Sequence, residues 1–471
     1  MKRKPKVIIL GAGPAGLGAG IELLSKKARI ILLEKKNQVG GISKTINYKG
    51  NYFDLGGHRF FTKSKEIMDL WQETLGDDFL ERKRLSRIYY QNKFFFYPLK
   101  PANALFNLGL FTSLEVLFSY FKSKIFPKKD EETFEGWVTN RFGEKLFNIF
   151  FKTYTEKLWG IPCNKMAAQW VAQRIRGLSL FSAIKNAFFP DRSGKIKTLI
   201  DRFHYPKYGP GMMYQKMGEN IKSQGGGILL NHNIQKIIHQ DNKIVAVKTQ
   251  SKDKILQQKG EYFISTIPLP LLVEKLKPSP PSKILEAAQN LSFRSFLVVN
   301  VILNVKDLFP DNWLYIHSPE VKLGRIQNYK NWSEDMIKNK EFTSLGLEYF
   351  CTEGDEFWSK KDQDIISLAL MELEKIKMAK ASHFVEGFVV RVPNAYPIYY
   401  LGYEEHLQMI RDYLSQFKNL QTVGRGGMFR YNNMDHSILS GIYAARNILG
   451  ANYNTWEINV EKEYLEEIKS E

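Results

Sequence analysis

The sequence has very little cysteine and none of the motifs that usually mark a metal site or a protein nucleophile. Its 471 residues include only two cysteines, Cys163 and Cys351, too few for a disulfide framework and not spaced as metal ligands. No Ser/His/Asp nucleophile elbow occurs either. These absences favour a reducing, cytoplasmic compartment, and they argue against a metal site and against catalysis by a protein nucleophile.

Internal repeats, low-complexity linkers and dense basic runs are also missing. The net charge is nevertheless +19, and 44% of the residues are hydrophobic. Because the lysines are scattered and not interleaved with aromatic residues, a nucleic-acid partner is not expected. An anionic substrate, an anionic membrane and a merely lysine-rich surface remain as explanations of the charge. The length predicts two or three domains.

The N-terminus carries the pattern of a dinucleotide-binding βαβ unit. An apolar strand at residues 7–10 stops at Gly11, an Ala/Gly/Leu-rich helical pattern follows, and a second strand ends at Glu34. Gly11 permits the tight turn, Gly13 lets the backbone approach a pyrophosphate, and Gly16 lets the helix lie close to the strand. Glu34 stands where a carboxylate accepts hydrogen bonds from a ribose diol. The pattern predicts a bound dinucleotide with its phosphates at the helix N-terminus.

Two further glycine pairs favour FAD over NAD. Gly40 and Gly41 follow the acidic strand end, and Gly56 and Gly57 precede His58. This arrangement resembles flavoproteins of the amine-oxidase type, in which the second pair passes near the phosphates and the third reaches the flavin ring. The predicted contacts of FAD are Gly11, Gly13, Pro14, Ala15, Gly16, Glu34, Lys35, Gly41, Gly57, His58, Gly424, Arg425, Asn433, Met434, Asp435 and Ser437.

The hydrophobic periodicity divides the chain into five segments of an α/β protein. We expect a Rossmann-like FAD-binding domain, an inserted helical region and an antiparallel β-sheet substrate domain. The FAD-binding domain is assigned to residues 1–90, 201–285 and 401–471, the last part ending in a C-terminal helix. The helical insertion is assigned to residues 91–200 and the antiparallel substrate domain to residues 286–400.

Residues 104–121 form the longest apolar stretch and are nearly long enough to span a bilayer. Because the stretch contains Asn107 and Glu115, we expect a buried helix. Lysines at positions 122, 124, 128 and 129 follow it directly, which leaves open a helix lying on an anionic membrane face. The protein would then be peripheral at the inner face of the membrane.

Four blocks of sequence resemble UDP-galactopyranose mutases, above all the longer eukaryotic type. They occupy residues 56–61, 159–174, 324–325 and 430–437. In that family, reduced FAD is the nucleophile that displaces the nucleotide diphosphate from the sugar, whose ring then opens and recloses at the other size. The resemblance implies this redox-neutral reaction on a nucleotide-diphosphate sugar, supplying furanose units for cell-surface polysaccharide.

The resemblance also implies roles for individual residues. Arg174 and Arg325 match a pair of diphosphate-binding arginines, and His58 matches a histidine on the loop beside the flavin. Guanidinium groups and phenols are the side chains that stabilise charge developing on a diphosphate leaving group. The implied catalytic residues are His58, Arg174 and Arg325, and the implied substrate-binding residues are Tyr97, Trp159, Arg174, Tyr315, Arg325, Tyr396 and Tyr431.

Some features depart from the mutase pattern or have two explanations. Leu99 and Lys100 follow the Tyr97–Pro98 pair where the family has an aromatic residue and a glutamine, and Arg59 follows His58. The sequence therefore does not identify the nucleotide or the sugar.

Asp435 either fixes the loop beside the flavin or caps the last helix. NADH or NADPH is the expected reductant, although no separate nicotinamide fingerprint is visible.

A different class of function is an FAD-dependent oxidase or desaturase, similar to protoporphyrinogen oxidase or amine oxidase. Such an enzyme would act on an apolar substrate, and residues 104–129 could hold it at a membrane. The two hypotheses differ in the electrostatics of the site, because an apolar substrate gives no reason to bury the cations of Arg174 and Arg325.

Overall fold

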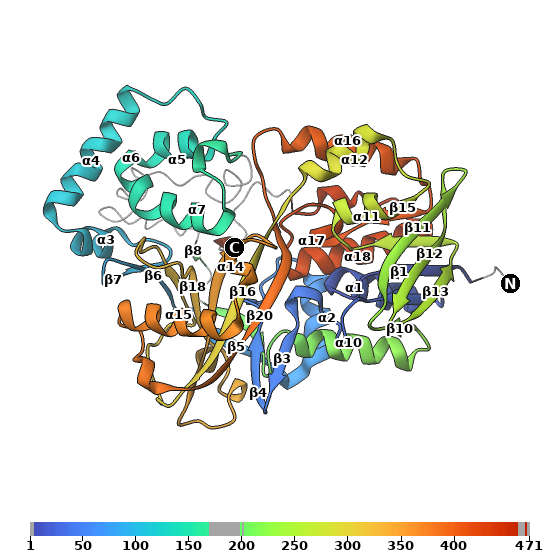
Figure 1. Ribbon diagram of the computed structural model, residues 1–471, viewed down its shortest axis with the longest axis horizontal. Helices are drawn as coiled ribbons and strands as arrows, with labels where there is room; N and C mark the ends of the chain where they lie inside the picture. Colours follow the sequence, from blue (N-terminus) through green and yellow to red (C-terminus); the bar gives the residue numbers. More distant parts are fainter. Residues whose placement is uncertain (1–3, 169–197, 200–201, 460–466, 469–471) are drawn as a thin grey trace.

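The computed structural model describes residues 4–168, 198–199, 202–459 and 467–468. A parallel sheet with its helices forms one half of the molecule, and a largely antiparallel sheet with a group of helices above it forms the other (Figure 1). Segments far apart in the sequence build each half.

The first half is organised by a five-stranded parallel sheet with the order β10-β2-β1-β14-β21. Val7 and Ile9 of β1 pack into the hydrophobic core on one face, and Ile8 and Leu10 into the core on the other. Burial on both faces explains the uninterrupted apolar run of this strand. The strands are β1 (Lys6–Leu10), β2 (Arg29–Leu33), β10 (Gly227–Leu229), β14 (Tyr262–Ser265) and β21 (Leu420–Thr422).

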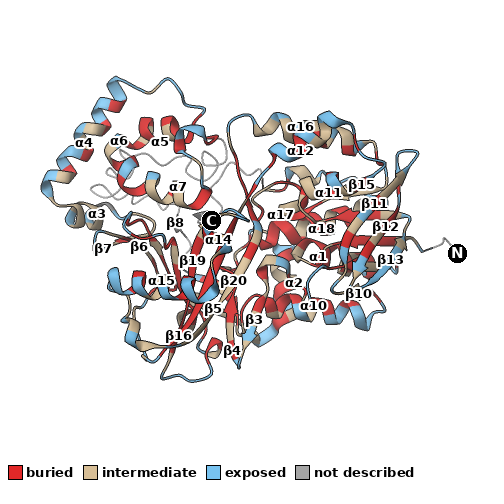
Figure 2. Cartoon of the chain, viewed as in Figure 1, coloured by how far each residue is buried: buried red, intermediate tan, exposed pale blue. Residues whose placement is uncertain are grey.

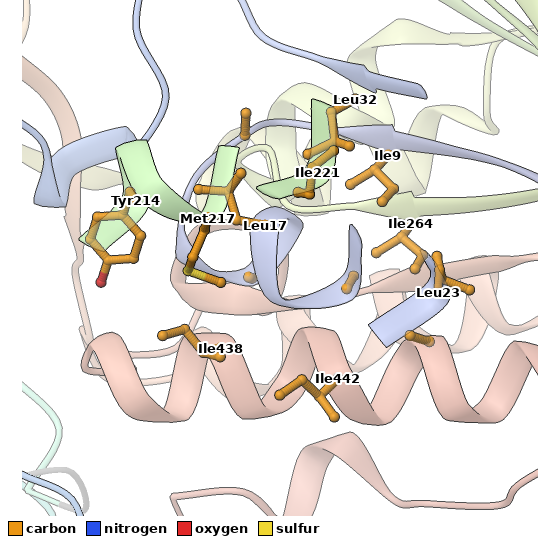
Figure 3. Packing of buried hydrophobic residues seen from close by; sticks show 14 of the residues in the cluster. Ile9, Leu17, Leu23, Leu32, Tyr214, Met217, Ile221, Ile264, Ile438 and Ile442 are labelled. Atoms are coloured by element: carbon orange, nitrogen blue, oxygen red, sulfur yellow. The ribbon is translucent and has the colours of Figure 1, made fainter. Parts of the chain in front are cut away.

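One face of this sheet is covered by α1 (Pro14–Ser25), α10 (Gly211–Ser223) and α18 (Met434–Ile448), with α2 (Lys65–Leu75) beside them. The first and last helices pack closely because glycines lie at their contact. A Cβ atom on Gly18 would lie 2.9 Å from the carbonyl oxygen of Ile438, and one on Gly441 would lie 2.0 Å from that of Ala15. Figure 3 shows Ile438 and Ile442 of α18 within the same core as Leu17 and Leu23 of α1.

The other face carries a four-stranded sheet and three helices. The sheet comprises β11 (Asn233–Gln240), β12 (Lys243–Ser251), β13 (Lys254–Lys259) and β15 (Leu276–Lys277), and the helices are α11 (Leu269–Lys275), α12 (Ser282–Asn290) and α16 (Tyr403–Ser415). Gly260 and Glu261 separate β13, at the edge of this four-stranded sheet, from β14 in the parallel sheet.

The other half contains a seven-stranded sheet with the order β20-β16-β19-β18-β17-β6-β7. Its strands are β6 (Ser86–Tyr90), β7 (Lys93–Phe96), β16 (Phe293–Leu303), β17 (Trp313–Ile316), β18 (Arg325–Asn328), β19 (Thr343–Cys351) and β20 (Phe384–Pro397). β6 pairs in parallel with β17, whereas the predicted boundary at residue 90 falls inside the β6–β7 hairpin. This hairpin therefore belongs to the sheet of the second half.

The helical unit above this sheet consists of α3 (Pro101–Leu108), α4 (Leu110–Ile125), α5 (Phe134–Phe142), α6 (Glu144–Phe147), a π-helical turn (Asn148–Lys152) and α7 (Thr153–Trp159). The prediction of one buried helix at residues 104–121 is wrong in two respects. The helix is broken at Gly109, and one side of α4 is exposed (Figure 2).

The remaining described elements are short. Three strand pairs are β3 (Thr45–Tyr48) with β4 (Asn51–Asp54), β5 (Phe79–Lys83) with β9 (Arg202–Pro206) and β8 (Thr198–Leu199) with β22 (Glu467–Ile468). The further helices are α13 (Tyr329–Trp332), α14 (Glu356–Ser359), α15 (Asp362–Lys375) and α17 (Gly424–Gly427). The 3₁₀ turns are Gly41–Ser43, Gly76–Asp78, Cys163–Lys165, Glu334–Met336, Ala381–His383 and Thr455–Glu457.

Candidate active site

A cavity of about 1560 Å³ extends from the parallel sheet to the helical unit. Single-ligand pockets usually measure roughly 300–1000 Å³, so this one has room for a dinucleotide and a second ligand. Apart from Gly16, every predicted site residue that the structure describes lines the cavity. Arg174 lies outside the described residues.

The first glycine turn and the N-terminus of α1 form one end of the cavity. Gly11 has a φ of +102°, and a Cβ atom there would lie 2.2 Å from Thr266 Oγ1. Gly13 is the N-cap of α1 and makes no side-chain capping bond, so its helix end presents backbone N–H groups to the cavity. Gly16 lies behind the turn, where a Cβ atom would lie 2.0 Å from the carbonyl oxygen of Gly11. The donors and the lack of side chains fit a pyrophosphate.

The carboxylate of Glu34 is fixed at the end of β2. One of its oxygens accepts a hydrogen bond from the backbone of Ala12, the other from the backbone of Lys36, both at 2.9 Å. Each carboxylate oxygen has a further lone pair, which fits a ribose hydroxyl. Gly41 lies close to Gly13, since a Cβ atom on Gly41 would lie 3.2 Å from the Cα of Gly13.

The C-terminal block approaches the same end of the cavity. Asn433 is the N-cap of α18 and forms a capping box with His436. The alternative that Asp435 caps this helix is therefore wrong. Asp435 instead lines the cavity with Asn433, Met434 and Ser437, and burial raises the pKa of its carboxyl group.

His58 lies on the loop after the third glycine pair. Its Nδ1 lies 3.1 Å from the carbonyl oxygen of Gly56; because a carbonyl only accepts, Nδ1 carries the proton and Nε2 is left as an acceptor. Burial, the charge of Arg425 and the charge of Arg325 together lower the pKa of His58 to about 4. The imidazole is therefore neutral at physiological pH.

Arg325 lies in the second half of the molecule, where three adjacent strands bring side chains into register. The ladder pairs Arg325 of β18 with Tyr315 of β17 and with Glu348 of β19. The guanidinium donates from Nε to the Tyr154 hydroxyl at 2.5 Å, and from Nη1 to Glu348 at 3.2 Å and to the Tyr396 hydroxyl at 3.4 Å. Burial disfavours its charge, but Tyr154 and Glu348 outweigh that effect and raise the pKa of Arg325.

The predicted substrate tyrosines form two aromatic pairs beside Arg325. Tyr396 and Tyr431 stack with their ring centroids 5.5 Å apart, and Tyr97 lies 4.8 Å from Tyr315. Trp159 packs 6.1 Å from Tyr396. Burial is the largest effect on the pKa of Tyr315 and of Tyr396 and raises both, so their hydroxyls stay protonated and can donate hydrogen bonds.

Comparison with known proteins agrees with this geometry. The sequence model of a family described as flavin-containing amine oxidoreductases matches residues 14–449. The chain belongs to this family. It is therefore a flavin-dependent enzyme, and FAD is its cofactor, as the glycine pattern predicts.

Curated relatives of this flavoprotein include 15-cis-phytoene desaturases. The protein from an Oncidium hybrid cultivar is 25% identical over 80% of this chain and 65% of its own length. The protein from Synechococcus elongatus is 22% identical over 79% of this chain and 80% of its own length. The chain thus spans slightly less than two thirds of the Oncidium relative.

Solved structures show the same fold. A reduced UDP-galactopyranose mutase has a TM-score of 0.84 and 21% identity, covering 97% of this chain and 96% of that one. A protein from an Exiguobacterium species described as a protoporphyrinogen oxidase has a TM-score of 0.70 and 17% identity, covering 95% and 99%. At these identities the likeness extends to the fold alone.

Three residues of the flavoprotein's cavity region escaped the sequence analysis. Tyr154 and Glu348 bond Arg325, and His317 stacks on Tyr154 with ring centroids 4.7 Å apart. Glu348 has a local signal, because it is the one acidic residue in the apolar strand 343–351 and is fully buried. Tyr154 and His317 have none.

The lining of the cavity is strongly cationic. Among the described residues it includes ten lysines and arginines but only two acidic residues, Glu34 and Asp435. Arg59, the departure next to His58, also lines the cavity and stacks on Trp313, 5.1 Å from the ring centroid. Such a lining favours a polyanionic ligand.

Proposed function

We propose that this flavoprotein isomerises the ring of a diphosphate-activated sugar, without net oxidation. The observation that carries the proposal is Arg325, whose side chain is only 16% exposed and is held by Tyr154, Tyr396 and Glu348 at the wall of a cationic cavity shared with the predicted FAD site. Burying a cation is costly unless it is paired. A site that keeps such a cation in the cavity lined by the predicted FAD contacts is suited to a ligand that carries negative charge.

In this scheme Arg325 stabilises the charge that develops on the departing diphosphate. Two of its nitrogens, Nε and Nη1, are fixed by hydrogen bonds within the described part of the chain, and Nη2 is left for the ligand. Fixed donors of this kind act without reorganisation during the reaction. The protonated hydroxyls of Tyr315 and Tyr396 are neutral donors at the same wall.

Reduced FAD, when bound, would supply the nucleophile for the anomeric carbon. The chain's own contribution on that side is His58, whose neutral ring offers Nε2 as an acceptor and adds no positive charge. Its place on the glycine loop sets it beside the expected position of the flavin ring. NADH or NADPH remains the expected source of the electrons that keep the flavin reduced.

A second candidate function is oxidation or desaturation of an apolar substrate. The relatives described as phytoene desaturases favour it, and so does an apolar lobe of the cavity lined by side chains such as Leu108, Val116 and Phe150. An entirely apolar substrate would, however, leave the buried Arg325 facing hydrocarbon. The first candidate accounts for this charge.

The test is a binding screen of UDP, dTDP and inorganic pyrophosphate against the reduced holoprotein, measured by the flavin absorption spectrum. The account expects the diphosphates to perturb the spectrum and Arg325→Ala to abolish the effect. Arg446→Ala is the matched control, because Arg446 pairs with Glu22 at 3.0 Å and does not line the cavity. Equal binding by both variants would contradict the proposal.

A further inference from the structure

The exposed side of α4 carries an unusual apolar stripe. Its members are spaced three, four, three and four residues apart, and each is between 54% and 85% exposed: Phe111, Leu114, Phe118, Phe121 and Ile125. The buried side of the same helix includes Ser113 and Ser123. A surface helix normally places its apolar stripe toward the core, so the outer side of α4 is built to contact something other than water.

The neighbouring residues extend this surface. Phe106 of α3 is 87% exposed, and Phe126 just after α4 is 73% exposed. In the part of the chain that the structure describes, no single helix is long and apolar enough to cross a bilayer; α3 and α4 reach that length and apolarity only together, as a pair bent by 117°. The geometry suits a pair of helices lying on a surface, at the outer edge of the molecule (Figure 1).

Positive charges lie at one end of the stripe. Lys122 and Lys124 occupy the last turn of α4, and Lys129 follows Phe126, whereas the charge of Lys128 is paired with Glu135 at 2.5 Å. Glu115, the acidic residue of α4, is neutralised by Lys145 at 2.6 Å. Apolar side chains flanked by lysines complement a bilayer with anionic headgroups; this charge pattern favours a membrane over a second copy of the chain.

The inner sides of the same two helices line the cavity. Leu105 and Leu108 of α3 and Val116 and Leu117 of α4 face its apolar lobe, together with Phe134, Phe142, Leu146, Phe150 and Phe151. This lobe is continuous with the part of the cavity that contains Arg325. One cavity therefore includes both the apolar lobe under the exposed helices and the cationic part that contains Arg325.

We propose that the outer face of α3 and α4 docks on an anionic membrane, and that the lobe beneath it receives the hydrocarbon chain of a membrane lipid. The head of that lipid would be the diphosphate-activated group at Arg325, a part of the inference that rests on the proposed function. A diphosphate-linked lipid fills both the apolar lobe and the part of the cavity that contains Arg325, whereas a soluble nucleotide sugar leaves the apolar lobe without a ligand.

Membrane docking is tested by flotation of the holoprotein with phosphatidylcholine vesicles, with and without about one quarter phosphatidylglycerol. We expect binding to the anionic vesicles, and at least a tenfold loss in Phe111→Ser/Phe118→Ser. Ile255→Ser/Met371→Ser is the matched control, because those apolar residues are 69% and 57% exposed elsewhere. Absence of binding overturns the docking proposal, and so does a concentration-dependent dimer that only Phe111→Ser/Phe118→Ser abolishes.

Lipid binding in the apolar lobe is tested by titrating the reduced holoprotein with geranylgeranyl diphosphate and with inorganic pyrophosphate, again with the flavin spectrum. We expect the prenyl compound to bind at least tenfold more tightly. Leu108→Trp and, independently, Leu105→Phe should remove this advantage and leave pyrophosphate binding unchanged. Equal affinities in the wild type overturn the lipid proposal alone, whereas failure of both compounds to bind contradicts the proposed function.

Discussion

Arg325 and Glu348 face each other on the adjacent strands β18 and β19 and form a largely buried salt bridge of 3.2 Å. The second oxygen of the same carboxylate accepts from the backbone N–H of Gly57 at 3.3 Å and from the side-chain amide of Gln327. One carboxylate thus joins the predicted diphosphate-binding arginine to the loop that carries His58. The position of each depends on the other.

Arg325→Ala should lower kcat by about 10²–10³, the usual effect of removing one stabiliser of developing charge. The content of FAD should not change, because the glycine turn and Glu34 lie at the other end of the cavity. Steady-state kinetics and the flavin-to-protein ratio of the purified variant test this expectation. Loss of flavin from Arg325→Ala would assign the residue a structural role instead.

The same substitution should also destabilise the fold, because it leaves the Glu348 carboxylate buried without its cation. Breaking a buried pair costs about 3–5 kcal/mol. Arg325→Met/Glu348→Gln removes both charges, and the amide oxygen introduced by the second substitution would still be able to accept from the Gly57 N–H. We expect this double variant to recover most of the free energy of unfolding, measured by urea denaturation, but none of the activity. Equal destabilisation of single and double variants would show that Glu348 does not need Arg325.

Tyr154→Phe should reduce kcat by roughly 10- to 100-fold, since it removes a hydrogen bond to a charged group worth about 1.5–3 kcal/mol. The control is Tyr89→Phe, which loses a hydroxyl bonded to Asn92 and does not line the cavity. Wild-type activity in Tyr154→Phe would mean that Arg325 keeps its orientation without this contact.

Gly11→Ala should yield protein that has lost FAD. A side chain is strained at the φ of +102° and would lie 2.2 Å from Thr266 Oγ1. Gly354→Ala is the control that separates backbone strain from the steric clash. Gly354 also has a positive φ, +86°, but no atom lies within 4 Å of the added carbon. The control should retain its flavin, as judged by absorbance at the flavin band.

His317 should make the stability of the protein depend on pH. Burial lowers the pKa of His317 to about 3 from an ordinary value of 6.5. Between these values the unfolded chain binds a proton that the folded protein does not, so the free energy of unfolding falls as the pH drops from 6.5 toward 3.

Asp54 opposes this pH dependence, because burial raises the pKa of its carboxyl to about 7. His58 acts in the same direction as His317, because its pKa is also lowered. The comparison with His317→Asn isolates one group. Above pH 6.5 the two stability curves should be parallel, and below it the wild-type curve should be steeper by up to about 1.4 kcal/mol per pH unit, one proton. Curves that stay parallel down to pH 4 contradict the assignment.

The local parts of the fold and site could be predicted from the sequence. The glycine turn at Gly11 and the acidic end of β2 at Glu34 depend on neighbouring residues, so their spacing carries the information. The same applies to the residues at the N-terminus of α18, although the cap is Asn433 and not Asp435, for which capping was one of two predicted roles.

The parts of the fold and site that depend on long-range pairing could not be predicted from the sequence. Arg325, Tyr315 and Glu348 meet because three strands align, and no spacing within any one strand specifies that register. Likewise, periodicity identifies an apolar stripe on α4 but does not say which side of the helix faces the core. The outward orientation of Phe111 and Phe118 emerges only from packing.

The most direct test of the account is turnover of a diphosphate-activated sugar, UDP-galactopyranose first, by the holoprotein in its reduced and oxidised states without oxygen. The account predicts isomerised product from the reduced protein only, over many turnovers, with no net consumption of reductant. Turnover by the fully oxidised protein, or consumption of one oxidant for each molecule of product, would contradict it.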